Sequence, residues 1–532
     1  MAHERLTGQP VPVQNTIFDG TMYDLGWNGQ RDIVASDTAP LPSADYAIYL
    51  INAVKFHCGQ IFHLFDEMSF MRRFHEFHAT TTDSSRPKDL WYVHFLIILA
   101  FGKVFAARRN NARRPPGAEL FVQAMKLKPD ITYLHTQPLQ AVEILCCEAL
   151  YLQCLDFRSA AYNVVGQALR IALAEGMHTN MEDQGLDETH VQRCRNVWWT
   201  VYILDRQMSS LMGVPLAVRD EDITASLPTF PGSVHKSIAL ELNVKFSRII
   251  SHILNTLYGT EGRLNRRFIT ITKDALKDTA SLTDQLKQSF DLPVPGSTGG
   301  ISRLAAHLHL LHHQCIVLAT RPLMFSLLKT RLDCPEKVQS LISTSAGARV
   351  LLQLCIESAQ HIVAVLERLK EQNLLESFLP FDMEAAFAAG MVLLLATVVD
   401  QALLGNQFPW LQMTYAILEE LISEGHLQAA ARENDLQQLQ QVLNLIPNSA
   451  AVRESQHSHP GQPTGLAQYS EFNDHEPSAN FHDPNFTSNN QTDLSFVDDT
   501  FWRTGFTADQ LVNVADTLDL DGIEWMTTGS SN

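Results

Sequence analysis

The sequence lacks the cysteine pattern of a disulfide scaffold and the long apolar run of a membrane protein. Its eight cysteines are scattered, no two form a C-x-x-C pair, and none occurs before Cys58. This spacing is typical of a reduced, intracellular protein. The longest apolar run, Ala385 to Val399, is shorter than the roughly 20 residues that cross a bilayer, and it predicts a buried core helix. The N-terminus has no apolar segment before a small-residue cleavage site, so we expect no secretory signal.

Basic residues are few. The chain has 40 Lys and Arg against 58 Asp and Glu, a net charge of −18. Nucleic-acid affinity comes mostly from basic side chains that neutralise phosphates, so this balance disfavours DNA binding by the chain surface as a whole. The one concentrated basic patch is Arg108, Arg109, Arg113 and Arg114, in a loop followed by two prolines. A nuclear-import signal or a phosphate contact is one interpretation of the patch, and a solvated loop is the other.

Alternating runs of β-branched residues are nearly absent, whereas apolar residues recur every three or four positions, which predicts an all-α fold. We divide the chain into a flexible N-terminal segment (1–40), an irregular multi-helix body (41–447) and a tail (448–532). From Ala451 onward, 13 acidic residues face only two arginines. Such a composition buries too little apolar surface to offset chain entropy, so we expect a disordered acidic tail with a nascent helix across Ala508 to Trp525.

The best-specified helix runs from about His190 to Met212, where apolar residues recur at helical spacing. Thr189 and Gln192 fit a capping box at its start. Gly213, with Pro215 close behind it, provides the stop. Four charged residues of this helix allow two interpretations, a ligand pocket or an ion-pair network that anchors the helix, and we favour the network. They are Arg193, Arg195, Asp205 and Arg206.

Motifs of catalysis are missing. The sequence has no G-x-S-x-G, no Walker loop and no H-E-x-x-H, and Gly296 to Gly300 lacks the strand and helix that a phosphate loop needs. His309 and His313 lie four apart, a spacing that can hold a metal, but no third ligand accompanies them. Packed or surface histidines are the preferred interpretation, and Cys147 and Cys154 are expected to be buried core thiols. We therefore predict no enzyme, no cofactor and no metal site.

The predicted helix and the segment that follows it resemble a known family. The segment from Gln192 to Pro228, QRCRNVWWTVYILDRQMSSLMGVPLAVRDEDITASLP, is similar to the hallmark of the fungal-specific transcription factor domain. This domain is the middle regulatory region of binuclear zinc-cluster transcription factors. The matching residues are Arg193, Arg195, Trp198, Trp199, Leu204, Asp205, Arg206, Gly213, Pro215, Asp222, Ile223 and Pro228.

Two further segments agree with the family pattern in the same order. Ala168 to Asn180 is similar to its A-x-x-x-A-x-x-x-G-L-H run, and Leu308 to Pro322 to its later L-H-x-x-Y-H-Q…R-P run. The second segment contains His309, Arg321 and Pro322. The resemblance implies an all-α regulatory body with structural or ligand-sensing motif residues.

The resemblance also implies partners and a location. Members normally begin with six cysteines that bind two zinc ions and a short helix that enters the major groove. Because no cysteine occurs before Cys58, we expect zinc only if an N-terminal cluster is missing from this chain. DNA would then be reached through such a module or through a homo- or heterodimer with a zinc-cluster factor. The implied function is nuclear, pathway-specific regulation of transcription, including secondary-metabolite genes, with an all-α small-molecule enzyme or a co-regulator or scaffold that binds no DNA as the alternatives.

The tail fits an activation region. Aromatic and aliphatic residues that acids keep in solution can be captured by the groove of a partner, such as the transcription machinery or a co-regulator. An inert, solubilising tail is the alternative interpretation. The candidate activation residues are Phe496, Phe501, Trp502, Phe506, Leu518 and Trp525.

Overall fold

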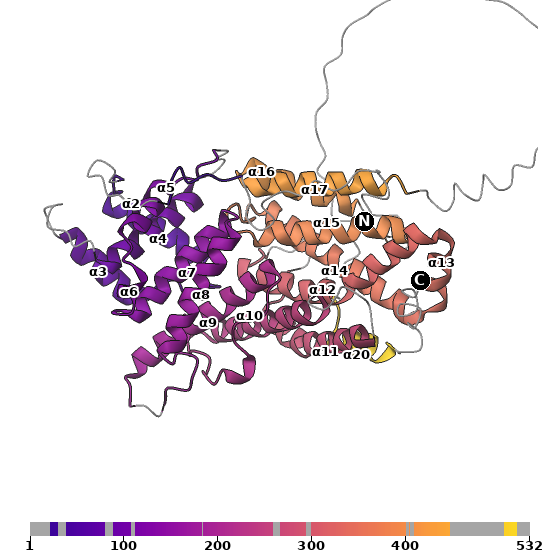
Figure 1. The fold of residues 1–532 in the computed structure, drawn as a ribbon, viewed down its shortest axis with the longest axis horizontal. Coiled ribbons are helices and arrows are strands. Elements are labelled where there is room, and N and C mark those ends of the chain that lie inside the picture. The colour runs from indigo at the N-terminus through magenta and orange to yellow at the C-terminus, as the bar shows by residue number, and fades with distance from the viewer. Residues whose placement is uncertain are drawn as a thin grey trace, which may run out of the picture.

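A computed structural model describes residues 22–29, 39–79, 89–107, 112–182, 185–258, 266–293, 299–400, 404, 409–446 and 505–518. Within these residues the chain forms helices and no strand, which confirms the all-α prediction (Figure 1). The N-terminal helices gather at one end of the molecule and the C-terminal helices at the other. Between them, α10 packs against α9, α11 and α12 and joins the two ends.

One large core cluster holds the N-terminal helices together. Its centre is α4, which is apolar on every face and is buried along nearly its whole length. A Cβ atom at Gly102 of α4 would lie 2.5 Å from the Cβ of Leu50, so the approach of α4 to α2 requires glycine. The helices of this end are α2 (Ala44–His57), α3 (Glu67–Ala79), α4 (Leu90–Ala106), α5 (Ala118–Leu127), α6 (Ile131–Leu134), α7 (Pro138–Cys154), α8 (Arg158–Ala174) and α9 (Glu188–Met212).

Two further clusters form the C-terminal end. The long helix α12 lies among α10, α11, α14 and α15. The elements of this end are η4 (Asp220–Asp222), α10 (Val234–Ile253), the π-helix η5 (Leu254–Tyr258), α11 (Arg266–Ser289), α12 (Arg303–Asp333), α13 (Pro335–Thr344), α14 (Ala346–Glu371), α15 (Phe381–Val399), α16 (Trp410–Ser423), α17 (Leu427–Leu443) and α20 (Ala508–Thr517).

Two helices, α14 and α15, are long and apolar enough to cross a bilayer. In the structure, 78% and 61% of their apolar windows are buried by other helices. The predicted run Ala385 to Val399 is the main part of α15, and its burial confirms the prediction of a core helix. Packing against neighbouring helices therefore accounts for the apolar character of both segments.

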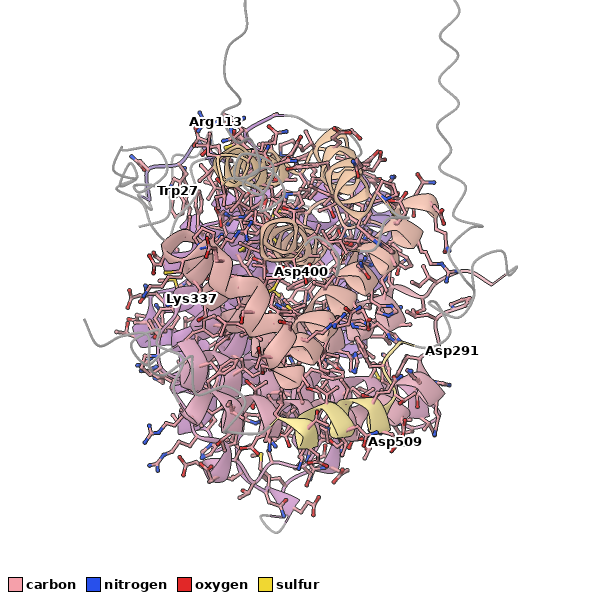
Figure 2. All side chains as sticks on the ribbon, turned by 90° about the vertical axis from the view of Figure 1, so that its right-hand side faces the viewer. Trp27, Arg113, Asp291, Lys337, Asp400 and Asp509 are labelled. Atoms are coloured by element: carbon pink, nitrogen blue, oxygen red, sulfur yellow. The ribbon has the colours of Figure 1, made fainter. Side chains whose placement is uncertain are left out.

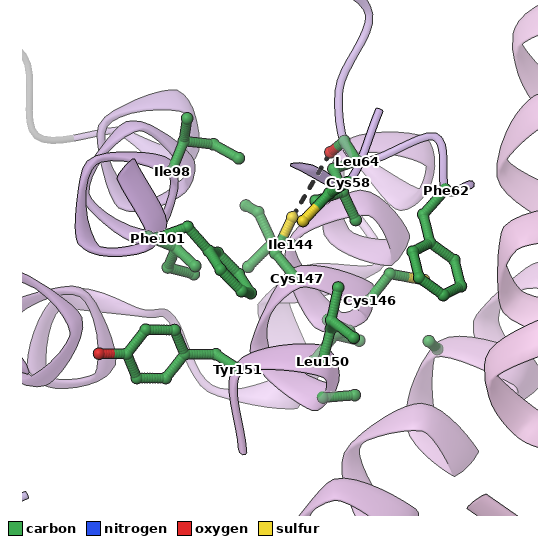
Figure 3. Close-up of a cluster of buried hydrophobic side chains, with 14 of the residues drawn as sticks. Cys58, Phe62, Leu64, Ile98, Phe101, Ile144, Cys146, Cys147, Leu150 and Tyr151 are labelled. Carbon is green, nitrogen blue, oxygen red and sulfur yellow. Dashed lines mark hydrogen bonds between the residues drawn. The ribbon is translucent and has the colours of Figure 1, made fainter. Parts of the chain in front are cut away.

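The cysteines of α7 are core residues, as predicted. Cys147 and Cys154 are fully buried. The thiol of Cys147 donates a hydrogen bond to the carbonyl of Leu64 at 3.5 Å, and Cys58 lies beside it (Figure 3). Burial raises the pKa of Cys147 well above its usual value, so the thiol stays protonated and unreactive.

The prediction of a flexible segment over 1–40 is wrong for residues 22–29. Tyr23 and Leu25 are buried in the N-terminal core. The backbone N–H of Asp24 donates to the carbonyl of Arg113 at 2.9 Å, and the Tyr23 hydroxyl accepts from the N–H of Leu427 at 3.2 Å. Residues 22–29 are therefore tied to the basic loop and to α17, whereas residues 1–21 and 30–38 lie outside the described residues.

The helix predicted within the tail is present over part of the predicted range, at Ala508–Thr517. The nascent helix expected there is α20, and it packs against α11 and α14 (Figure 2). Thr507 and Gln510 form a capping box at its start. Four of the candidate activation residues, Phe496, Phe501, Trp502 and Trp525, lie outside the described residues.

Candidate regulatory site around helix α9

The signature helix α9 begins two residues earlier than predicted. Asp187, not Thr189, is its N-cap, because the Asp187 carboxylate accepts the N–H of His190. The predicted stop is confirmed, since Gly213 adopts the left-handed conformation (φ 64°) and its N–H bonds to the last carbonyls of the helix. Pro215 follows in the exposed turn.

The first half of α9 is anchored by a buried carboxylate on α7. Arg193 donates two hydrogen bonds to Glu143, from Nε at 3.0 Å and from Nη2 at 2.7 Å. The His63 ring lies 3.2 Å from the same carboxylate. Burial raises the pKa of Glu143, but the hydrogen bonds of His63 and Arg193 outweigh it and lower the pKa to about 2. The carboxylate is therefore charged and fully paired.

Arg195 and the paired tryptophans also hold structure together. Arg195, which is buried, donates to the exposed Glu182 at 2.5 Å. Trp198 is fully buried in the core, with the His178 ring 5.7 Å away. Trp199 donates from its indole N–H to the carbonyl of Ser226 at 3.1 Å, which ties the segment after α9 to the helix.

Arg206, in the second half of α9, binds the same segment after the helix. Its Nη2 donates to the carbonyl of Val218 at 2.8 Å and to the carboxylate of Asp220 at 2.9 Å. The hydroxyl of Tyr202 donates to the same carboxylate at 2.7 Å. Further along this segment, the Asp222 carboxylate makes an exposed 3.6 Å pair with Arg219, and Pro228 is buried.

Asp205 differs from its neighbours because burial dominates its chemistry. Burial raises its pKa to about 6, and the nearby charges of Arg206 and Arg170 oppose the rise. Of the two interpretations given to the charged residues of α9, the anchoring network describes Arg193 and Arg195. Arg206 belongs to both, since it anchors Asp220 and also lines a cavity at this end of α9.

The Arg321 and Pro322 pair on α12 has a local explanation. Proline has no N–H, so the carbonyl of Leu318 four residues earlier lacks its helical partner. The hydroxyl of Tyr258, at the end of η5, donates to that carbonyl at 2.9 Å. The guanidinium of Arg321 lies 5.4 Å from the centre of the Tyr258 ring and donates to its hydroxyl at 3.3 Å. These two residues therefore fasten η5 to α12.

The histidines of α12 are core residues. His309 hydrogen-bonds through Nε2 to the carbonyl of Phe290 at 2.8 Å, and burial lowers its pKa to about 4. His313 stacks on His361 of α14 with ring centres 4.8 Å apart. No group of three metal-ligating side chains occurs within the part of the chain that the structure describes. The geometry therefore favours the packed-histidine interpretation over a metal pair.

The tail helix α20 covers this histidine pair. Leu511, Ala515 and Leu518 are fully buried against the body. The ring of Phe506 lies 6.3 Å from that of His313 and 6.0 Å from that of His361. At the exposed edge, Lys277 of α11 pairs with Asp516 at 2.8 Å. Phe506 and Leu518, predicted to be free for a partner, are thus occupied by the body of the same chain.

Sequence reasoning missed this docking although a signal was present. Leu511, Ala515 and Leu518 follow one another at steps of four and three, which is the spacing of a single helical face.

In the predicted basic loop, Arg113 has a hydrogen bond, because its Nε donates to the carbonyl of Met22 at 3.3 Å. Arg108 and Arg109 lie outside the described residues, so the import signal stays a prediction.

Comparison with known protein families finds a match to part of the chain. The family described as fungal specific transcription factor domain matches residues 48–291, from α2 to just beyond α11. The predicted resemblance is thereby confirmed, and the Leu308 to Pro322 segment lies beyond the matched range. No solved structure matches the chain.

Three of its relatives are named as regulators. An uncharacterized transcriptional regulatory protein of Schizosaccharomyces pombe is 25% identical over 373 residues, which cover 68% of this chain and 45% of that protein. The thiamine repressible genes regulatory protein of the same yeast is 23% identical, over 57% of this chain and 39% of its own length. Activator of stress genes 1 of Saccharomyces cerevisiae is 23% identical, over 35% of this chain and 20% of its own length.

The matched part thus spans less than half of each of these relatives. The hallmark residues of α9 lie within the matched range, in the segment that folds back along this helix. Residues 48–291 of this chain therefore match the family described as fungal specific transcription factor domain.

Proposed function

We propose that this protein regulates transcription in the nucleus and that its helical body controls access to its acidic tail. The observation that carries the proposal is the docking of α20 on α11 and α14 of a chain with a fungal transcription factor domain. The names of the relatives support regulation and give no support to catalysis. DNA contact would be supplied by a zinc-cluster module, on a partner chain or elsewhere in the same protein.

The tail would act by capturing the transcription machinery or a co-regulator. Its apolar residues 511, 515 and 518 face the body, so a partner that needs this helical face must displace it from α11 and α14. Burial of a leucine side chain is worth about 1.5–3 kcal/mol, so Leu511 and Leu518 hold the helix on the body by an amount that a partner can match. The docked state would be the less active one.

A reporter assay tests this proposal. The full chain, fused to an unrelated DNA-binding module, should raise reporter output in yeast, and residues 448–532 fused alone should raise it more. Leu511→Asp places a charge in the buried contact, so it should undock α20 and increase the output of the full-chain fusion several-fold.

A matched control is available on the same helix. Asn513 is exposed, so Asn513→Asp adds the same charge without touching the body. Its output should equal that of the unmodified fusion. Equal output from Leu511→Asp and Asn513→Asp would contradict control by docking, and no output from any fusion would contradict activation.

A further inference from the structure

A cavity of about 160 Å³ lies at the C-terminal end of α9, between α7, α9, α10, α12 and α15. Part of its wall is apolar and includes Ile250, Leu310 and Phe381. This volume is close to the roughly 150 Å³ of an engineered cavity that binds benzene. The space therefore suits a molecule of about six to ten non-hydrogen atoms.

Several of the polar side chains that line this cavity are buried and have atoms without a hydrogen-bond partner among the described residues. Arg206 is 2% exposed, and its Nε and Nη1 have no hydrogen-bond partner among the described residues. The same holds for the amide oxygen of Gln153, for Nε2 of His307 and for the hydroxyl of Ser251. Buried polar atoms are nearly always bonded in native proteins, so several around one space indicate a binding site.

Arg206 makes one end of the cavity positively charged. Arg206 shares Nη2 with Asp220, which leaves the N–H groups of Nε and Nη1 as donors. Gln153 and His307 offer acceptor atoms, and Glu384 lines the same space.

We propose that this cavity binds a small monocarboxylate, whose carboxylate accepts hydrogen bonds from Arg206 and whose short apolar body lies against Ile250, Leu310 and Phe381. A hydroxyl or amino group on the ligand would donate to Gln153 or His307. The bound molecule would bridge α9, α10 and α12, the helices that join the two ends of the body. Binding to the purified chain does not depend on the regulatory role proposed above.

The test is a titration of the purified full chain with a matched pair of probes, 4-methylpentanoate and 4-methylpentan-1-ol, followed by calorimetry and thermal unfolding. The two probes share their apolar body and differ in the charged group. Binding of the carboxylate should be saturable and at least about tenfold tighter than that of the alcohol, since charge-assisted hydrogen bonds are the strong ones. Equal affinities, or no binding of either probe because the cavity holds only water, would overturn the proposal.

Variants locate the site. Arg206→Gln should weaken carboxylate binding at least about tenfold and leave alcohol binding unchanged. Arg219→Gln is the matched control, because Arg219 is 84% exposed and lies outside the cavity. Since Arg206→Gln also disturbs Asp220, Ser251→Leu gives a second route by filling the cavity from α10, and it should abolish binding of both probes while helical circular dichroism is preserved. Unchanged carboxylate binding in Arg206→Gln and Ser251→Leu would overturn the assignment.

Discussion

Two hollows border opposite ends of α9, and they differ in how their polar groups are used. The groove at the N-terminal end measures about 510 Å³ and is lined by Glu143, Arg193 and Arg73, all of which are ion-paired. The cavity at the C-terminal end measures only about 160 Å³, yet Arg206 and His307 keep atoms without partners there. The larger hollow is therefore the poorer ligand site, because Glu143, Arg193 and Arg73 already pair within the fold.

The pKa values of two carboxylates show the same difference between the groove and the cavity. Glu143 beside the groove has its pKa lowered to about 2 by His63 and Arg193 in spite of burial. Glu384 in the cavity has its pKa raised to about 7, because burial outweighs the attraction of Arg158 and Arg432. A paired carboxylate stays charged in the folded chain, whereas a buried carboxylate without a close partner is shifted toward its neutral form.

The largest effect is expected where the paired cluster is broken. Glu143→Ala leaves Arg193 without its carboxylate in a partly buried place, and removal of one partner of a buried ion pair costs about 3–5 kcal/mol. Urea unfolding of the full chain, followed by circular dichroism, should show this loss of unfolding free energy. The control is Glu67→Ala, which removes the exposed partner of Lys55 and should cost less than about 1 kcal/mol. Equal losses for the two variants would contradict a structural role for the groove charges.

The second prediction concerns acid. Since the folded-state pKa of Glu143 lies below its unfolded value of 4.5, its contribution is complete above about pH 4.5 and is lost as the pH falls toward 2. The advantage of the unmodified chain over Glu143→Gln should therefore shrink by about 3 kcal/mol across that window, at 1.36 kcal/mol per pKa unit. Unfolding titrations of both proteins at stepped pH measure this, and a constant difference down to pH 3 would refute the low pKa.

The paired end of α9 was largely predictable, because its signals are local. The spacing of apolar residues between Val191 and Leu211 predicted the helix, and Gly213 predicted its end. The cap at Asp187 was missed because the Thr189 hydroxyl can accept the same kind of hydrogen bond as the Asp187 carboxylate, and only the backbone conformation decides between them. Local patterns thus gave the elements and the buried cysteines of α7.

The open end could not be predicted, because its chemistry is a property of the assembled helices. Gln153, Arg206 and His307 are far apart in sequence and come together only when α7, α9 and α12 pack. No sequence pattern marks a missing hydrogen bond, because it depends on the hydrogen-bond partners of all the surrounding groups. The docking of α20 lay in between, because Leu511 and Leu518 mark a helical face but not the surface that covers it.

The third prediction concerns Glu384 in the cavity, where stability should depend on pH in the opposite direction to that at Glu143. The pKa of Glu384 is raised above its unfolded value, so the ionised form destabilises the folded state above about pH 7, and this penalty disappears below about pH 4.5. Glu384→Gln should therefore stabilise the chain at pH 8 by about 1–3 kcal/mol, with a gain that vanishes near pH 4. Thermal unfolding at the two pH values measures it. A loss of stability at pH 8 would show that Glu384 is paired like Glu143.

The smallest effect is expected at the hallmark residue Asp222, which separates structure from function within one motif. Its pair with Arg219 is long, at 3.6 Å, and both side chains are mostly exposed, so Asp222→Ala should change the unfolding free energy by less than about 0.5 kcal/mol. The reporter assay described above then becomes informative for this residue. If output falls while stability is unchanged, Asp222 contacts a partner or a second subunit. If the unfolding free energy falls by more than about 1 kcal/mol, the exposed pair anchors the segment after α9 as Arg206 does. The ion pairs that hold this segment would then extend beyond the end of the helix.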